Sequence, residues 1–249
     1  MDQSTFVLIA TAAFVISGTV KGVTGIGLPT AAIACMTLFF DPRTAIALVL
    51  FPMVGSNIWQ MIRGGEFKRT ARRYGLFATI LFLGVGGTAY ATQNTSDRAL
   101  LAILGVVVLV FVIMTWRKLI PPLADRYDTA AQIGFGLLTG VVGGMTAAWG
   151  TPMAMYLATK GVDKDEFIRA TGFMISVGSL PLVLAYIQFG FLTGPLAGIS
   201  AAMLIPTLIG FTLGETLRNR MSVEAFRNAI LVLFVVLGLN LIRRAIWYT

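Results

Sequence analysis

The sequence predicts an all-α polytopic membrane protein made of two inverted-topology repeats, each a broken or re-entrant helical hairpin followed by three transmembrane helices. Composition is the first indication: of 249 residues, 57% are hydrophobic and 12% charged, with a mean hydropathy of +0.83. A soluble domain carries about twice that share of charged residues. The second indication is a pair of apolar segments broken by glycine and proline, residues 18–29 and 140–152, at corresponding places in the two halves. Such pairs are typical of membrane proteins built from internal repeats.

Six further apolar stretches each run to roughly 20 residues, which as helix is about the thickness of a bilayer. They are residues 44–62, 74–90, 99–116, 170–189, 192–213 and 223–242. The N-terminal residues 1–4 contain no basic residue ahead of the first apolar run. That run is therefore expected to remain in the mature protein and not to act as a cleaved signal peptide.

Five basic residues in the loop after the first of these spans predict the cytoplasmic side of the membrane. They are Arg63, Lys68, Arg69, Arg72 and Arg73. If each broken segment crosses the membrane once, ten basic residues lie in the cytoplasm and eight outside, with Lys21 left out of the count. If each is a hairpin, the counts are fourteen and four. The charges favour hairpins, the first entering from the exterior and the second from the cytoplasm, which gives the two halves opposite orientations.

Internal matches predict that the repeats are residues 1–122 and 123–249. Glycines and prolines of the broken segments recur at a nearly constant offset, which rises by one residue within the segment. The pairs are Gly18 and Gly140, and Gly22 and Gly144, at 122, then Gly27 and Gly150, and Pro29 and Pro152, at 123. The tripeptide at 54–56 also recurs at 177–179. Four other glycines, Gly84, Gly87, Gly210 and Gly214, are expected only to permit close helix packing.

The Gly-x-Pro pattern in each broken segment predicts a half-helix that starts inside the membrane. Proline suits the first turn of a helix, and Thr151, just before Pro152, is a good N-cap candidate. The first turn of a helix exposes unpaired N–H groups and roughly half a positive charge. Because lipid offers these groups no partner, an anion held between the two helix starts is the expected occupant.

Polar side chains near the breaks complete the predicted site. Lys21 would add a full positive charge, although its long side chain could instead extend to the membrane interface. Hydroxyl and amide groups, Gln60 and Ser176 among them, could donate to the anion or could bond their own helix backbone. Trp149 could line the site or simply pack. The predicted substrate-binding residues are Lys21, Thr24, Gly25, Gly27, Pro29, Thr30, Ser56, Asn57, Thr146, Trp149, Gly150, Thr151, Pro152 and Ser179.

Several classes of function are disfavoured. The chain has a single cysteine, Cys35, and no histidine, so no catalytic residues, metal site or cofactor is expected. The 19 basic residues lie mostly in short loops, where they orient membrane insertion, so the net charge of +8 does not indicate nucleic-acid binding. The predicted spans carry no carboxylate in their central turns, and no proton relay is expected.

The two glycine clusters, 18–29 and 140–152, and the length of about 250 residues resemble the TauE/SafE (TSUP) family of bacterial sulfite and organosulfonate exporters. The resemblance covers essentially the whole chain. It implies a multi-pass protein of the bacterial inner (cytoplasmic) membrane that carries small sulfur-containing anions such as sulfite, sulfoacetate or sulfolactate. The family is usually described as having about eight spans, and counting each hairpin arm brings the two descriptions together.

The sequence thus predicts a secondary transporter that exports such an anion by alternating access around the two breaks. Its partners are the small anionic substrate and the lipid bilayer. An anion channel and a permease subunit of a larger complex remain alternatives, while an intramembrane enzyme would lack its usual residues. The exact anion, a coupling ion and a homo-oligomeric state remain open.

Overall fold

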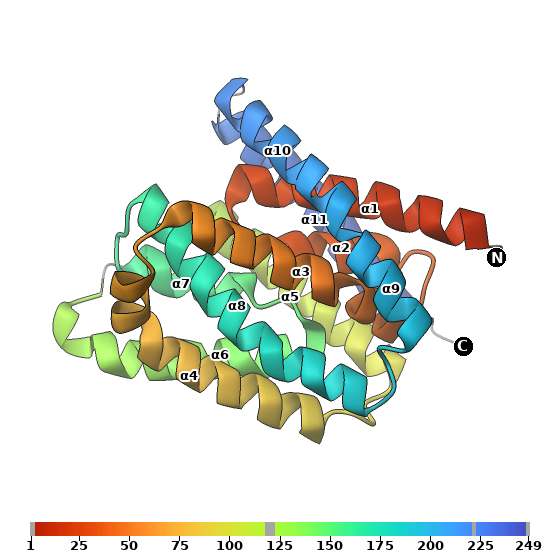
Figure 1. Cartoon of the computed structure of the whole chain (residues 1–249), viewed down its shortest axis with the longest axis horizontal. Helices are drawn as coiled ribbons and strands as arrows, with labels where there is room; N and C mark the ends of the chain where they lie inside the picture. Colours follow the sequence, from red (N-terminus) through yellow and green to blue (C-terminus); the bar gives the residue numbers. More distant parts are fainter. Residues whose placement is uncertain (1–2, 118–122, 221–222, 248–249) are drawn as a thin grey trace.

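The computed structural model describes residues 3–117, 123–220 and 223–247, and this part of the chain is helical with no strand (Figure 1). The helices are α1 (Gln3–Thr24), α2 (Leu28–Met36), α3 (Pro42–Gly64), α4 (Phe67–Ala91), α5 (Asp97–Arg117), α6 (Asp128–Thr146), α7 (Gly150–Thr159), α8 (Lys164–Gln188), α9 (Gly194–Ala202), α10 (Leu204–Arg220) and α11 (Val223–Ile246), with a short 3-10 helix, η1 (Asp125–Tyr127). The all-helical prediction is confirmed. The predicted boundary between the repeats borders residues 118–122, which lie outside the described residues.

Within the described residues, six helical segments are long and apolar enough to cross a membrane. Five of them coincide with predicted spans, and the sixth is the 21-residue stretch Ser4–Thr24 of α1. The remaining predicted span, 223–242, falls within α11. The predicted span 192–213 is two helices, α9 and α10, separated at Met203. Pro206 explains this break, because it cannot donate to the carbonyl four residues earlier.

Ion pairs and polar contacts define the two ends of the helix bundle. At the Arg63 end, Arg63 pairs with Glu215 at 3.1 Å and Arg73 pairs with Glu166 at 2.6 Å. These pairs join the end of α3 to α10, and the start of α4 to the start of α8. At the opposite end, the Arg43 end, the guanidinium of Arg43 lies 3.4 Å from Asp97 at the start of α5. The basic loop 63–73 therefore lies at the Arg63 end, which is the end predicted to face the cytoplasm.

Both broken segments turn back toward the end from which they enter. The rings of Phe6 in α1 and Phe40 after α2 are 4.7 Å apart, so the two arms of the first segment meet at their outer ends. In the second segment, the Leu123 N–H donates to the Thr159 carbonyl at 2.9 Å, which brings the entry to α6 against the end of α7. The first hairpin opens toward the Arg43 end, where α3 begins, and the second toward the Arg63 end, where α8 begins.

Glycines hold the long arm of each hairpin against a helix of the other half. A Cβ at Gly140 would lie 2.8 Å from the Gly84 Cα, and one at Gly144 would lie 2.8 Å from the Val85 carbonyl, so α6 and α4 touch backbone to backbone. The α1–α10 contact is built in the same way, with no room for a Cβ on any of its glycines, which are Gly18, Gly22, Gly210 and Gly214. Packing roles are thus confirmed for Gly84, Gly210 and Gly214, whereas Gly87 has nothing within 4 Å and its predicted packing role is wrong.

Candidate functional site

The two helix breaks share one local construction. Thr24 closes α1 and Thr146 closes α6, and each hydroxyl donates to the carbonyl four residues earlier, at 2.8 Å and 2.7 Å. Each hydroxyl also accepts from the N–H two residues later. The chain then reverses through positive φ angles, at Gly25 (φ 80) and Gly27 (φ 91) in the first break and Ala147 (φ 56) in the second. Thr24 and Thr146 therefore shape the breaks, and their hydroxyls are committed to the backbone.

The half-helices start one residue away from where the sequence match places them. α2 begins at Leu28 and α7 at Gly150, which are 122 residues apart, as are Thr24 and Thr146. Gly27, the N-cap of α2, therefore corresponds to Trp149, the N-cap of α7, and its predicted pairing with Gly150 is wrong. The predicted N-cap role of Thr151 is also wrong, because this residue lies in the first turn of α7; its side chain is outside the described part of the structure.

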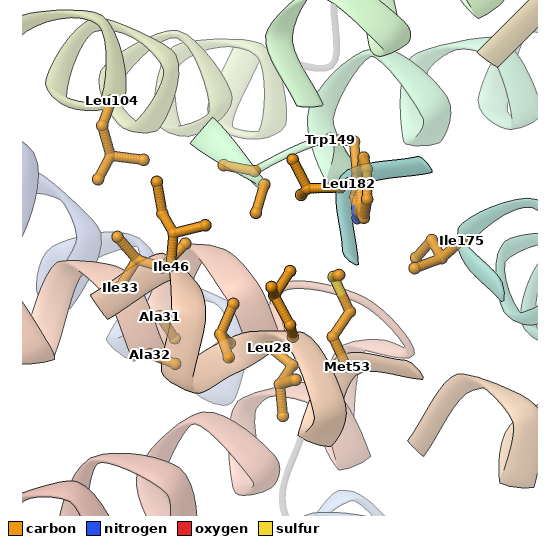
Figure 2. Packing of buried hydrophobic residues seen from close by; sticks show 14 of the residues in the cluster. Leu28, Ala31, Ala32, Ile33, Ile46, Met53, Leu104, Trp149, Ile175 and Leu182 are labelled. Carbon is orange, nitrogen blue, oxygen red and sulfur yellow. The ribbon is translucent and has the colours of Figure 1, made fainter. Parts of the chain in front are cut away.

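The N-termini of the two half-helices meet inside the bundle. A Cβ at Gly150 would lie 3.7 Å from the Ile26 side chain and 4.0 Å from the Gly27 nitrogen. Pro29 and Pro152 are buried in the first turns, and at neither N-cap does a side chain accept a hydrogen bond from the N–H groups of the helix start. Figure 2 shows Leu28, from the start of α2, in the same buried cluster as Trp149. Two partial positive charges thus converge on one buried place.

Lys21 lies one helical turn before the first break and is 1% exposed. Its ammonium donates to the Ser56 hydroxyl on α3 at 3.0 Å. Among the described residues, no carboxylate pairs with it. Extension of Lys21 to the membrane interface, the alternative left open by the sequence, is not what the structure shows, since the side chain is enclosed. A buried ammonium without a carboxylate partner is costly, which makes Lys21 a candidate for binding an anion.

Two buried polar atoms beside these residues have no hydrogen-bond partner. One is the indole Nε1 of Trp149, a fully buried residue whose ring occupies the space left by Gly143. The other is Oδ1 of Asn57, which is 1% exposed. The Asn57 amide nitrogen donates to the Met53 carbonyl at 2.7 Å, and because a carbonyl only accepts, this bond fixes which atom is the free oxygen. Buried polar atoms normally have partners, so these two atoms are candidates for bonding a ligand.

Other predicted polar residues lie on α2 and α8. Thr30 is buried in the first turn of α2, beside the junction of the half-helices. Ser179 and Ser176 lie on α8, where their hydroxyls donate to carbonyls of their own helix. For these two serines the structure thus shows the alternative of bonding their own helix backbone.

Gln60 has a larger structural part than its sequence predicts. Its amide nitrogen lies 3.4 Å from the Gly25 carbonyl at the first break, 2.8 Å from the Ile168 carbonyl and 3.0 Å from the Thr171 hydroxyl on α8. Its Oε1 is buried and has no partner. A single glutamine thus joins α3, the first hairpin and α8. A polar residue inside an apolar span indicates that its side chain has a hydrogen-bond partner, but the sequence does not identify that partner.

No group of three or more histidine, cysteine, aspartate or glutamate side chains within the described ranges could hold a metal ion. The donor set at the junction is an ammonium, an indole N–H and helix N-termini, which suits an anion. A family model described as Sulfite exporter TauE/SafE matches residues 9–241 of the chain. Curated proteins and solved structures give no match.

Proposed function

Since the chain belongs to the sulfite exporter TauE/SafE family, we propose that it is a secondary transporter of small sulfur-containing anions such as sulfite, sulfoacetate or sulfolactate. The anion is held between the N-termini of α2 and α7, and the protein exports it across the cytoplasmic membrane by alternating access. The two repeats, 1–122 and 123–249, move relative to each other around this point.

The observation that carries the proposal is the buried ammonium of Lys21 close to two helix N-termini. Lys21 is 1% exposed and bonds a neutral hydroxyl, so its charge is not balanced by a carboxylate of the described chain. The helix starts add positive potential of their own. A sulfite or sulfonate group brings negative charge and several acceptor oxygens, and it would supply what Lys21 and the Trp149 N–H lack.

The free oxygen of Asn57 supports a finer statement about the substrate. This atom accepts only, so an anion without a hydrogen atom to donate leaves it unpaired. Hydrogen sulfite and the hydroxyl group of sulfolactate both carry a donor. Sites that hold buried polar groups discriminate strongly against ligands that leave these groups unpaired. We therefore expect hydroxylated sulfonates to bind more tightly than sulfonates of the same size without a hydroxyl group.

Thermal stabilisation of the purified protein by a panel of anions tests the proposal, because a ligand that binds the native state raises the unfolding midpoint. The panel contains sulfite, sulfoacetate, sulfolactate, 3-sulfopropionate, sulfate and matched carboxylates. Selective stabilisation by sulfite or sulfonates, lost in Lys21→Met, is the expected result. A folded protein that no anion of the panel stabilises would contradict the site.

Flux in proteoliposomes separates a transporter from a channel. A transporter shows slow flux that saturates with substrate concentration and is accelerated by substrate on the opposite side. A channel, with both ends open at once, shows neither. Flux of the stabilising anion that does not saturate would be compatible with the proposed binding site, but it would indicate a channel in place of alternating access.

A further inference from the structure

A cavity at the Arg63 end of the bundle reaches a residue that contacts the first helix break. At the Arg63 end, a cavity of about 340 Å³ lies between α3, α8 and α10, and its lining includes Arg63, Ile168, Arg169, Phe211 and Glu215. The deepest part of this lining is Gln60, which is 3% exposed. The cavity can hold a small oxyanion with its water, and it ends at the residue that contacts the first helix break.

At the Arg43 end, the pocket beside Arg43 is nearly closed, whereas a more open pocket of about 350 Å³ lies between α5 and α11, with Ser96, Ala99 and Ile242 in its lining. The pocket beside Arg43 measures about 20 Å³, which is room for about one water molecule. Arg43 pairs with Asp97, donates to the Thr95 carbonyl and lies 4.5 Å from the centre of the Phe191 ring. Tyr90 and Gln188 join α4 to α8 beside it. Of these pockets, the one at the Arg63 end contains Gln60, the residue that contacts the first helix break.

Gln60 lines the Arg63-end cavity and also contacts Gly25 at the first helix break. Ser56, the partner of Lys21, lies four residues before Gln60 and thus on the same face of α3. Deeper access between α3 and α8 is narrow, because a Cβ at Gly172 would lie 3.2 Å from the Met61 nitrogen and 3.5 Å from the Gln60 side chain. Three acceptors, two carbonyls and a hydroxyl, hold the Gln60 amide nitrogen across this passage, as described above.

We propose that Gln60 is the gate between the Arg63-end cavity and the anion site, and that this gate is closed in the described conformation. The inference rests on the proposed anion site. When the Gln60 amide leaves the Gly25 and Ile168 carbonyls, the passage opens and the amide N–H groups can donate to the passing anion. The free Oε1 is consistent with this role, since an amide locked for structural reasons would normally have both ends bonded.

Cysteine accessibility tests the gate, and the chain suits the method because Cys35→Ala removes its single cysteine. Three single reporters are placed in that background: Ile168→Cys in the open cavity, Met145→Cys in the closed pocket and Met53→Cys beyond the gate. Met53 is fully buried and lies near Leu28 and Trp149 in the cluster of Figure 2. Sealed vesicles of known orientation are treated with the sulfonatoethyl or the trimethylammonioethyl methanethiosulfonate, which are similar in size and opposite in charge.

We expect Ile168→Cys to react from one membrane face and Met145→Cys to react much more slowly from either. Met53→Cys should react from the same face as Ile168→Cys, slowly in the parent and at least about tenfold faster once Gln60→Ala removes the amide. Gln60→Glu should slow the anionic reagent at Met53→Cys relative to the cationic one by about tenfold, the effect of one charge at close range in a partly polar site. The matched control is Gln93→Glu, which places the same charge in the closed pocket.

Equal effects of Gln60→Glu on both reagents, or an unchanged Met53→Cys rate in Gln60→Ala, would overturn the gate. If Gln60→Ala does not fold, Gln60→Asn replaces it, because an amide one methylene shorter cannot reach all three acceptors. The ratio of the reaction rates of the two reagents is insensitive to a general increase in the accessibility of the protein interior. Since the cysteine test uses no substrate, its result is independent of the thermal-stabilisation panel. The gate can be refuted while anion binding is confirmed, and anion binding can be refuted while the gate is confirmed.

Discussion

Replacing Lys21 with methionine, which has a similar length and no charge, should remove anion binding and leave the empty protein at least as stable. The Lys21 ammonium is buried and donates to the Ser56 hydroxyl. Removing a buried charge that lacks a counter-charge relieves its desolvation cost. A lysine with a structural role would behave oppositely, since its loss would lower the stability of the empty protein.

The size of the effect follows from Coulomb's law. Two unit charges about 4 Å apart interact by about 4 kcal/mol at an effective dielectric constant of about 20, so losing one of them weakens binding by two to three orders of magnitude. A ligand at about 100 times its dissociation constant stabilises the parent by about 2.7 kcal/mol. If the dissociation constant rises about a hundredfold, the same concentration contributes only about 0.4 kcal/mol.

The assay is thermal unfolding with and without the best anion of the panel, and Lys160→Met is the control. Lys160 is also enclosed, with a side chain 7% exposed, but it pairs with Asp125 at 2.7 Å and Asp128 at 3.3 Å. Its replacement should lower the stability of the empty protein and preserve the anion response. The opposite pattern, with Lys21→Met destabilised yet still stabilised by the anion, would refute the site.

Three further predictions concern packing, the indole and pH. Gly144→Ala should destabilise the protein by about 1–3 kcal/mol in thermal unfolding, because the added Cβ would overlap α4. Gly87→Ala should be neutral or mildly stabilising, because a Cβ there has nothing within 4 Å. Equal effects of the two substitutions would contradict the backbone contact between α6 and α4. Trp149→Phe should weaken anion binding about tenfold without lowering the stability of the empty protein, and unchanged affinity would remove the indole from the site. The hydrogen bond from Lys160 lowers the pKa of Asp125 below its ordinary 3.8, so the ion pair stabilises the protein above pH 3.8 and this stabilisation is lost on acidification below it. The same bond raises the pKa of Lys160 above 10.5, so at alkaline pH the stabilisation ends only above pH 10.5. The unfolding midpoints of Asp125→Asn and the parent should therefore differ by a constant amount between pH 5 and 9 and converge below about pH 3. A difference that persists below about pH 3 would contradict the stabilising role of the ion pair between Lys160 and Asp125.

Sequence alone locates the helix breaks well because glycine and proline act locally. Gly25 and Gly27 adopt the positive φ angles that a reversal requires, and Pro29 lies in the first turn of α2, as its lack of an N–H favours. The second break is predicted less well. There the reversal passes through Ala147, a residue that gives no such signal, and Trp149, not Thr151, caps the helix.

The site residues divide in the same way. The sequence leaves open whether Lys21 is buried or extends to the membrane interface, and both its burial and its Ser56 partner depend on how the helices are arranged. Threonines at the breaks look like ligand donors in sequence, yet Thr24 and Thr146 bond the backbone that they shape. The free atoms of Trp149 and Asn57 are properties of the assembled core, which no local pattern encodes.

A single buried lysine also gives the proposed transport a direction. With a monoanion bound, the Lys21 site is neutral, and without it the site carries one positive charge. In a cell that is negative inside, the potential then acts on the return of the empty site, drawing it inward with up to about 2.3 kcal/mol per 100 mV. With a dianion the loaded site is negative and is driven outward. In both cases the field favours export, so a carrier built around Lys21 needs no coupling ion to move its anion out of the cell.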